Sequence, residues 1–389
     1  MKPSELPVLK LKRGPGRPRV LAGHPWVYAN ELEALPDAAF DGLALSLRDQ
    51  RGRSLGSGIY NSRSQIAWRR FSRADGIPFD MGYLADALQE AVGRRAEEPC
   101  RRLVWSDADY IPGLIVDQFD ELVVVQAVTK AVETQLDEIC NWFAETLEPA
   151  DILLRNDAPV REREGLESYV RTHSGRTLEP RWVDIDGLEY ELDLANSQKT
   201  GFYLDQREQH GLVASLAEGR RVLDGFCNQG AFGLQAAKAG AEEVTCVDSS
   251  ADCIEAVRRN AARNECTVEA VEANMFDTMK ALEPGAFDLI VLDPPSFARN
   301  RKSVAGALRG YKELNLRAFQ SLPSGGILAT YCCSQHVSAT EYEQVVASAA
   351  ADAGREARLF ARTGQPFDHP VRINFPESEY LKGLIYAVE

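Results

Sequence analysis

From residue 220 onward, short apolar segments alternate with longer segments of helical periodicity. The apolar segments include VLDGF, VTCVD, LIVLD and ILATYC, and amphipathic stretches of helical length separate most of them. Continuous apolar strands separated by helices are typical of a parallel, doubly wound α/β sheet. The last two strands, EARLF and YLKGLIYAVE, have no helix between them, so we expect the terminal strand to pair antiparallel.

Two different patterns precede this region. Residues 1–75 contain short β-like pieces separated by Gly, Asn and Ser turns, which predicts a small barrel or sandwich. Residues 76–100 have helical spacing, and the alternation over 102–129 predicts a β-hairpin followed by a helix and a further strand, DILLRND. We therefore expect three domains: a small β domain at 1–75, a central α+β domain at 76–190 and the α/β sheet at 191–389.

The composition is that of a globular chain with an uneven charge distribution. No apolar run approaches the length of a membrane span, and no secretory signal is visible, so we expect a cytoplasmic protein with reduced cysteines. The five scattered histidines and the absence of a CxxC pair predict no metal site. The net charge of −14 argues against a protein that coats nucleic acid. Residues 1–80 nevertheless hold 13 Lys and Arg against 8 Asp and Glu, which is compatible with RNA binding or with a solvated basic face.

The stretch RVLDGFCNQGAFGLQAAKAG at 221–240 reads as a strand, a loop and a helix. In such sheets ligands bind beyond the carboxyl ends of the strands, where Asp224 and then Asp248 follow successive strands. An acidic residue after the second strand suits NAD as well as S-adenosylmethionine. However, Gly225 and Gly230 lack the middle glycine of GxGxxG, and Asp224 would repel a phosphate. The loop therefore favours S-adenosylmethionine, with Asp248 on its ribose.

Two further strand ends carry candidate binding groups. In ANMFD, Asn274 and Phe276 are placed to hold the edge and the face of an adenine. In LDPPSF, two prolines fix the backbone so that Asp293 projects rigidly from a strand end. A carboxyl group there can accept from an exocyclic amino group or pair with ring N3 of a flipped base. The structural alternative is a strand-end turn capped by the aspartate.

The segment TYCCS at 330–334 follows the next strand. A Cys thiolate that adds to C6 of cytosine activates C5 for methylation, whereas methylation of an amino nitrogen requires no such cysteine. Strand alternation places Cys332 and Cys333 on opposite faces, so only one should reach a substrate, and the spacing does not say which. Asp293 would then neutralise charge that develops on the ring. A buried structural cysteine is the alternative interpretation.

Motifs along nearly the whole chain resemble a known family. GHPWVY and its strand spacing resemble a PUA domain, a small RNA-binding barrel. Together with DYIPGLIVDQF, KTGFYLDQR, VLDPPSFARN, RGYKELN, TYCCS and DHPVRINFPESEYLKG, they resemble the 23S ribosomal RNA cytosine-5 methyltransferase I family. The resemblance implies a PUA domain, a central domain, a seven-stranded Rossmann-like methyltransferase domain and S-adenosylmethionine as methyl donor. It also places the nucleophile of the TYCCS motif on Cys333.

These expectations assign residues to three roles. The expected catalytic residues are Cys333 and Asp293. The expected donor contacts are Gln206, Arg207, Asp224, Phe226, Gly230, Asp248, Ser249, Asn274, Phe276 and Asp293. The expected RNA contacts are Lys12, Arg13, Arg17, Arg301, Lys302, Arg309 and Lys312, because basic loops suit phosphates.

Two alternatives stay open beside the cytosine-5 reading. One is an RNA methyltransferase that acts on an amino nitrogen, and the other is a non-catalytic RNA-binding protein of ribosome assembly. The expected partner is large-subunit ribosomal RNA, with no membrane and no metal, and a homodimer is left open.

Overall fold

The computed structural model describes residues 6–13, 18–196, 200–298 and 300–389. The chain forms two compact units, each assembled from several segments. Unit 1 comprises Met1–Pro180, Leu192–Leu204 and Phe367–Ser378, and unit 2 comprises Arg181–Glu191, Asp205–Pro366 and Glu379–Glu389. The expected three-way division at residues 75 and 190 stays a prediction.

Unit 1 begins with a five-stranded β domain. Its strands are β1 (Val8–Lys10), β2 (Trp26–Val27), β3 (Ala44–Arg48), β4 (Ser54–Tyr60) and β5 (Trp68–Ser72), in the order β1-β3-β4-β5-β2. Leu45, Leu47, Tyr60 and Trp68 are buried in its core. A Cβ on Gly58 would lie 2.3 Å from Trp68 Cε2, so the indole lies directly over this glycine. The small β domain predicted from the turn spacing is therefore confirmed.

The second part of unit 1 is an α+β block around a five-stranded sheet. Its strands are β6 (Cys100–Trp105), β7 (Leu114–Phe119), β8 (Leu122–Ala127), β9 (Asp151–Asn156) and β10 (Tyr169–Thr172), in the order β10-β9-β8-β7-β6. Its helices are α1 (Met81–Gly93), α2 (Lys130–Thr134), α3 (Leu136–Leu147) and α4 (Val160–Glu164). The predicted hairpin is β7–β8, and its turn contains Asp120 at φ +54°.

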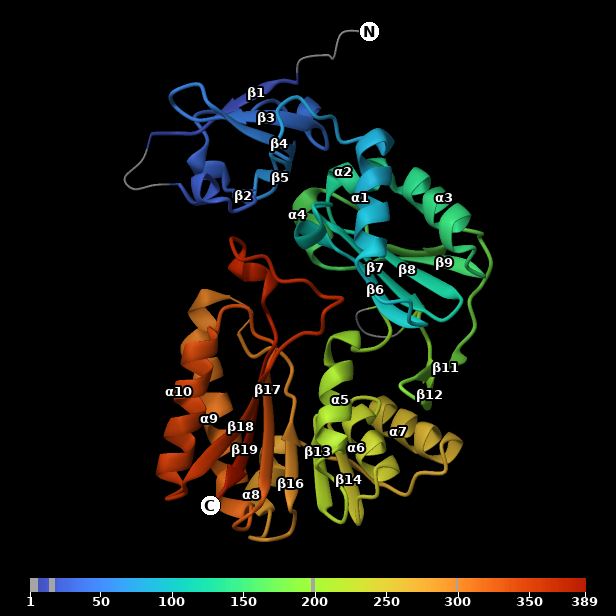
Figure 1. Ribbon diagram of the computed structural model, residues 1–389, viewed down its shortest axis with the longest axis vertical. Helices are drawn as coiled ribbons and strands as arrows, with labels where there is room; N and C mark the ends of the chain where they lie inside the picture. Colours follow the sequence, from blue (N-terminus) through green and yellow to red (C-terminus); the bar gives the residue numbers. More distant parts are fainter. Residues whose placement is uncertain (1–5, 14–17, 197–199, 299) are drawn as a thin grey trace. The chain divides into compact units, whose positions relative to one another are not determined.

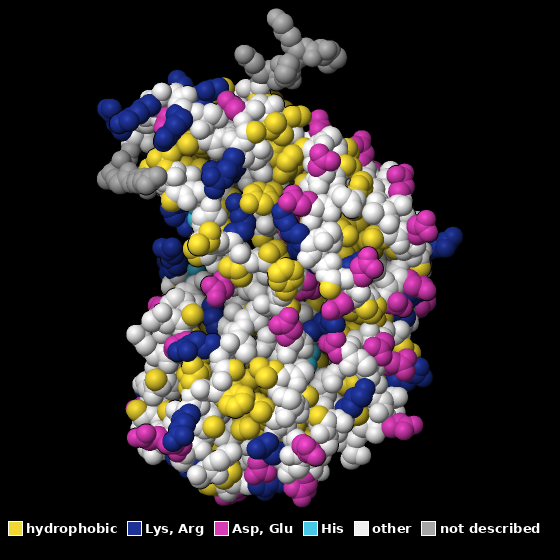
Figure 2. All heavy atoms as spheres, in the orientation of Figure 1, with side chains coloured by type: hydrophobic (Ala, Val, Ile, Leu, Met, Phe, Trp, Pro, Cys, Tyr) yellow, Lys and Arg dark blue, Asp and Glu magenta, His cyan; other side chains and the backbone are white. Residues whose placement is uncertain are grey.

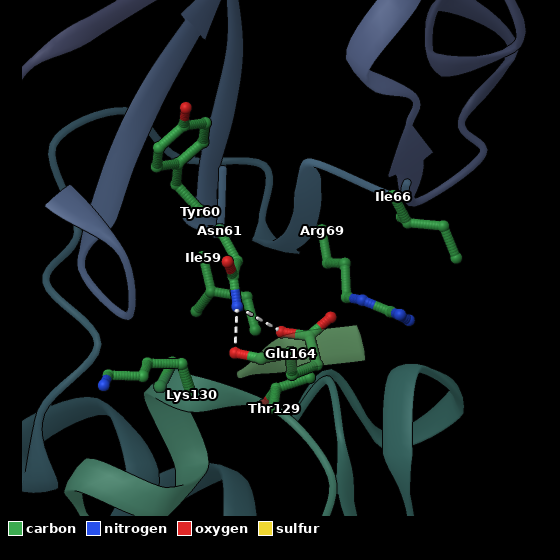
Figure 3. Close-up of a pocket in the computed structure, with 9 residues that line it drawn as sticks. Ile59, Tyr60, Asn61, Ile66, Arg69, Thr129, Lys130 and Glu164 are labelled. Atoms are coloured by element: carbon green, nitrogen blue, oxygen red, sulfur yellow. Dashed lines mark hydrogen bonds between the residues drawn. The ribbon is translucent and has the colours of Figure 1, made fainter. Parts of the chain in front are cut away.

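A buried hydrogen-bond pair joins the β domain to this block within unit 1 (Figure 3). The Asn61 side chain donates to the Glu164 carbonyl oxygen at 3.0 Å and to its carboxylate at 2.7 Å. The cavity beside this pair has a volume of about 10 Å³. That volume holds about one water molecule, so the cavity is a packing gap and no ligand site.

Unit 2 is built on a seven-stranded sheet. Its strands are β13 (Arg221–Gly225), β14 (Glu243–Asp248), β15 (Glu269–Glu272), β16 (Leu289–Leu292), β17 (Ile327–Cys332), β18 (Ala357–Thr363) and β19 (Lys382–Val388), in the order β15-β14-β13-β16-β17-β19-β18. All neighbours among β13–β17 are parallel, whereas β19 is antiparallel to β17 and β18. The doubly wound sheet and its antiparallel terminal strand, both predicted from the apolar pattern, are confirmed.

Helices cover both faces of this sheet (Figure 1). One face carries α5 (Arg207–Ala214), α6 (Ala231–Lys238) and α7 (Ala251–Arg263), and the other carries α8 (Met275–Ala281), α9 (Val304–Ser321) and α10 (Ala339–Asp352). The amphipathic stretch between LIVLD and ILATYC forms α9, which begins at Val304. None of the helices in the described part of the chain is long and apolar enough to cross a membrane.

Two elements of unit 2 were not anticipated from the sequence. The hairpin β11 (Arg181–Ile185) and β12 (Leu188–Leu192) turns at Asp186 and Gly187, whose φ values are +55° and +79°. The short helix α8 begins directly after Asn274, in a stretch interpreted only as a strand end. Short 3₁₀ helices lie at Arg19–Ala22, Ala29–Glu31, Ala38–Phe40, Ser106–Asp109, Leu204–Gln206, Arg301–Ser303 and Pro376–Ser378.

Candidate active site

The loop after β13 has an unusual backbone. Phe226 and Asn228 have φ values of +63° and +49°, and Gly230, which precedes α6, has +82°. Left-handed conformations at non-glycine residues cost about 1–2 kcal/mol each, so other contacts must hold them. The Cys227 amide donates to Val247 O at 3.0 Å, and the Asn228 amide donates to an Asp248 carboxylate oxygen at 3.1 Å. The end of β14 thereby fixes the loop that follows β13.

Asp224 is fully buried at the end of β13, with 1% of its surface exposed. Its Oδ2 accepts a hydrogen bond from the Gly233 amide at 2.8 Å, and its Oδ1 has no hydrogen-bond partner in the described structure. The pKa of Asp224 is raised to about 7, chiefly by burial and also by the charges of Asp293 and Asp248, while the hydrogen bond from the Gly233 amide opposes the shift. A buried carboxyl group with one vacant oxygen is prepared to meet a cation or a hydrogen-bond donor.

The side chains of Asp224, Asp248 and Asp293 thus influence one another where β13, β14 and β16 end. Asp248 uses both oxygens, one for the Asn228 amide and one for the Ser250 amide at 2.9 Å. Asp293 directly follows β16, where its amide faces Gly225 O at 3.4 Å. Acidic groups gathered in this way fit the positively charged sulfur and amino group of S-adenosylmethionine, and they disfavour a phosphate.

The other expected donor contacts lie around the same sheet edge. Ser249 is exposed beside Asp248, and the exposed Asn274 caps α8 through its side chain, which accepts from the Phe276 amide at 2.9 Å. The Phe276 ring is half-buried, 5.9 Å from the ring of Phe297. Asn274 therefore already uses its side-chain oxygen locally, whereas the Phe276 face remains suited to an adenine.

Gln206 and Arg207 lie at the start of α5 and point to different surroundings. Gln206 is buried, and its side-chain oxygen lacks a hydrogen-bond partner in the described structure. Arg207 instead pairs with Asp186 in the β11–β12 turn, with its Nε 3.0 Å from Oδ2. Gln206 thus fits a ligand contact better than Arg207 does.

The two cysteines of TYCCS have different environments. Cys332 is fully buried on β17, in the core formed with α9 and α10. Cys333 follows the strand, is half-buried, and its Sγ lies 3.8 Å from the carbonyl oxygen of Pro294 in the DPP segment. The thiol of Cys333 therefore lies against the segment that carries Asp293. His336, the nearest histidine in sequence, is exposed.

A polar network not anticipated from the sequence joins TYCCS to the DPPSF segment. The Ser334 hydroxyl contacts the Tyr311 hydroxyl at 2.9 Å and the Ser296 hydroxyl at 3.1 Å, and the Ala298 amide donates to it at 3.3 Å. Lys382 Nζ donates to the Ser334 carbonyl oxygen at 2.8 Å. Tyr311 and Lys382 belong to the motifs RGYKELN and YLKG, but their spacing gave no sign of this role.

The expected RNA contacts are divided between the units. Lys12 and Arg13 are exposed in unit 1, and Arg17 lies outside the described residues. In unit 2, Arg301, Lys302 and Arg309 are exposed on a 3₁₀ helix and on α9. Lys312 instead pairs with Asp352 of α10 at 2.7 Å. Figure 2 shows Lys and Arg side chains gathered over the N-terminal β domain on one face.

The aromatic residues of GHPWVY are largely engaged inside unit 1. His24 is buried and contacts the Glu377 carboxylate at 2.8 Å, while the Trp26 indole donates to Asp107 at 2.9 Å. The Trp26 ring also packs 4.8 Å from the ring of Phe375. These contacts favour a packing role over base stacking for this cluster. The residues that the structure describes contain no group of His, Cys, Asp and Glu that could hold a metal ion.

Comparison with solved structures supports the fold. A candidate S-adenosylmethionine-dependent methyltransferase from Streptococcus mutans superimposes with a TM-score of 0.82 over 98% of this chain and 100% of that chain, at 18% identity. A candidate methyltransferase solved in complex with SAH gives a TM-score of 0.78 over 98% of this chain and 100% of that chain, at 19% identity. At these identities the likeness establishes the shared fold.

Sequence comparison establishes the family. Residues 105–362 match the family described as S-adenosylmethionine-dependent methyltransferase, and residues 9–73 match the PUA-like domain. The ribosomal RNA large subunit methyltransferase I of Tolumonas auensis is 35% identical over 94% of this chain and 96% of its own length. That of Shewanella amazonensis is 35% identical over 98% and 99%. The chain therefore belongs to the ribosomal RNA large subunit methyltransferase I family, enzymes that join a PUA-like domain to an S-adenosylmethionine-dependent methyltransferase domain.

Proposed function

We propose that this chain methylates carbon 5 of a cytosine in large-subunit ribosomal RNA and that Cys333 is the nucleophile. The observation that carries the proposal is the half-buried Cys333 thiol, 3.8 Å from Pro294 O, whereas its neighbour Cys332 is sealed in the core. The relatives are ribosomal RNA large subunit methyltransferases, which supports ribosomal RNA as the substrate and, with it, a cytoplasmic location. A homodimer stays a prediction.

Each residue has a defined task in this proposal. The vacant Oδ1 of Asp224, the carboxylate of Asp248 and the face of Phe276 would hold the donor, whose bound form supplies an electrophilic methyl group on a positively charged sulfur. The Cys333 thiolate forms a bond to C6 of the cytosine, which leaves C5 electron-rich. Asp293 pairs with ring N3 and offsets the charge that develops on the ring. C5 then takes the methyl group that the donor would supply, as the bond between that group and the positively charged sulfur breaks. Loss of the C5 proton restores the double bond and expels the thiolate from C6.

Mass spectrometry of ribosomal RNA nucleosides from a deletion strain tests the assignment. Complementation with the Cys333→Ala variant should lower one 5-methylcytosine by at least about a thousandfold, because loss of a covalent nucleophile removes the main path. The matched control Cys332→Ala shortens a buried thiol that contacts no substrate, so it should keep the modification. Retained methylation in Cys333→Ala would instead favour an amino-nitrogen methyltransferase.

A substrate analogue tests the covalent step directly. RNA with 5-fluorocytosine has no C5 proton to lose, so the bond between Cys333 and C6 should persist after methyl transfer. We expect a denaturant-stable protein–RNA adduct with wild type and with Cys332→Ala, and none with Cys333→Ala. An adduct that persists in Cys333→Ala would assign the nucleophile elsewhere.

A further inference from the structure

Lys382 is a buried cation next to the proposed nucleophile. It opens β19, only 7% of its surface is exposed, and its Nζ donates to the Ser334 carbonyl oxygen at 2.8 Å. Lysines are almost never buried unless a negative group is paired with them. Among the residues that the structure describes, none is close enough to form an ion pair with Lys382. A buried ammonium group whose hydrogen bond goes to a carbonyl oxygen is therefore unusual.

The geometry directs this charge toward the turn that carries Cys333. Lys382 lies opposite Cys332 in the antiparallel register of β17 and β19, and its Nζ reaches the residue that follows Cys333. The same residue, Ser334, is held on its other side by the hydroxyls of Tyr311 and Ser296. The hydrogen bond to the Ser334 carbonyl oxygen therefore ties the ammonium group to the turn that carries Cys333.

Lys382 supplies positive charge close to this turn. The titratable groups near the turn are Asp293 after β16, Tyr311 on α9, Cys332 on β17, His336 after β17, and Glu379 and Lys382 at β19. Burial lowers the pKa of Lys382, and negative charge on Cys332, Cys333 and Glu379 opposes that shift. Because an interaction between two charges is mutual, a protonated Lys382 favours a thiolate at Cys333. Cys332 is sealed in an apolar core, so the half-exposed Cys333 gains most.

We propose that Lys382 is a positioning residue that stabilises Cys333 as a thiolate and fixes the turn on which Cys333 lies. The inference rests on the proposed function for the use of that thiolate. The thiol proton passes to solvent, Lys382 keeps its own proton, and the resulting pair of opposite charges replaces a buried cation without a counter-ion. The same charge stabilises the thiolate when it leaves the methylated base.

Alkylation of Cys333 tests this role without RNA or donor. The rate of iodoacetamide modification would be followed by peptide mass spectrometry between pH 6 and 10 in wild type, Lys382→Met and Lys382→Arg. We expect the apparent pKa of Cys333 to rise by about one unit in Lys382→Met, which slows alkylation at pH 7 by about tenfold. Lys382→Arg keeps the charge and should restore most of the rate. Cys253 and Cys266, both half-buried on or after α7, are internal controls whose rates should not change.

Two further variants keep the test decisive. If Lys382→Met does not fold, Lys382→Gln keeps a donor for the Ser334 carbonyl without the charge. Tyr311→Phe perturbs the Ser334 contacts with the charge in place, so it should leave the Cys333 pKa unchanged. An unaltered Cys333 pKa in any folded variant without the charge would overturn the proposal. If the pKa shifts as expected but Cys333→Ala still methylates RNA, the charge pair stands and the proposed function fails.

Discussion

At the scale of single residues, Asp224 shows how burial changes the chemistry of an ordinary side chain. A carboxyl group in water has a pKa near 4, whereas burial raises that of Asp224 to about 7. The folded chain without donor therefore binds a proton that the unfolded chain releases. The contribution of Asp224 to the free energy of unfolding is therefore fully present below about pH 4 and is lost as the pH rises through about 7. The loss is on the order of 4 kcal/mol.

This shift predicts pH-dependent donor binding. A positively charged donor favours the ionised form of Asp224, so its affinity should rise by roughly tenfold between pH 6 and pH 8. Titration calorimetry with S-adenosylmethionine at several pH values measures the effect.

The matched variant is Asp224→Asn, which keeps the shape and removes the titration. It should bind the donor weakly, with an affinity that does not vary over this pH range. S-adenosylhomocysteine, which lacks the sulfonium charge, should respond less to pH in the wild type. An affinity of wild type that is constant from pH 6 to 8 contradicts this account.

At the scale of elements, regular patterns were predictable and local exceptions were not. The strands of unit 2 are continuous apolar segments, and the missing helix before β19 correctly indicated antiparallel pairing. The hairpin β11–β12 was missed, although its alternation around Asp186-Gly187 is a signal for a tight turn. The seven residues of α8 are too few for a helical period to stand out.

The loop after β13, which we propose binds the donor, yields a prediction at this scale. Gly230 has a φ of +82°, and a Cβ there would lie 3.2 Å from Val257. Gly230→Ala should lower the free energy of unfolding by about 1–2 kcal/mol and weaken donor binding, because it displaces the start of α6. Chemical denaturation and titration calorimetry measure the two effects.

Gly219→Ala is the matched control for this loop. Gly219 has a φ of +65° and open space around its missing Cβ, so the variant keeps the backbone penalty without the contact. It should lose stability with unchanged donor affinity. If both variants lose the same donor affinity, the backbone conformation at Gly230 has no particular role in donor binding.

At the scale of the whole molecule, the chain passes several times between its two units. The segment Phe367–Ser378 follows β18 of unit 2 but belongs to unit 1. There the Asn374 side chain donates to Gly23 O at 2.9 Å, and Arg372 donates to Asp107 O at 2.7 Å. The motif DHPVRINFPESEYLKG thus serves both units, because its second half returns to the sheet with Lys382.

The charge distribution predicts how RNA binding responds to salt. The proposed phosphate contacts Arg301 and Lys302 are exposed, whereas Lys312 is paired with Asp352. Replacement of both exposed residues by Gln should weaken RNA binding and reduce the slope of log affinity against log salt by roughly 1.5–2.

Filter binding would measure these slopes between about 50 and 300 mM salt, the range over which phosphate contacts weaken strongly. Lys312→Gln is the control, and it should change the slope less because its charge is already compensated. A wild-type affinity that does not depend on salt would exclude phosphate contacts as the basis of binding.

The sequence by itself predicted the parallel, doubly wound sheet and singled out the loop after β13, the DPP segment and the cysteine pair, because these depend on local periodicity and on short motifs. Only the tertiary structure decided which cysteine is accessible. Alternation along the strand places the two cysteines on opposite faces, but it does not tell which face α9 and α10 cover. It also decided the pKa of Asp224 and the place of Lys382. Both depend on groups far apart in sequence that packing brings together, and such long-range burial leaves no period in the chain.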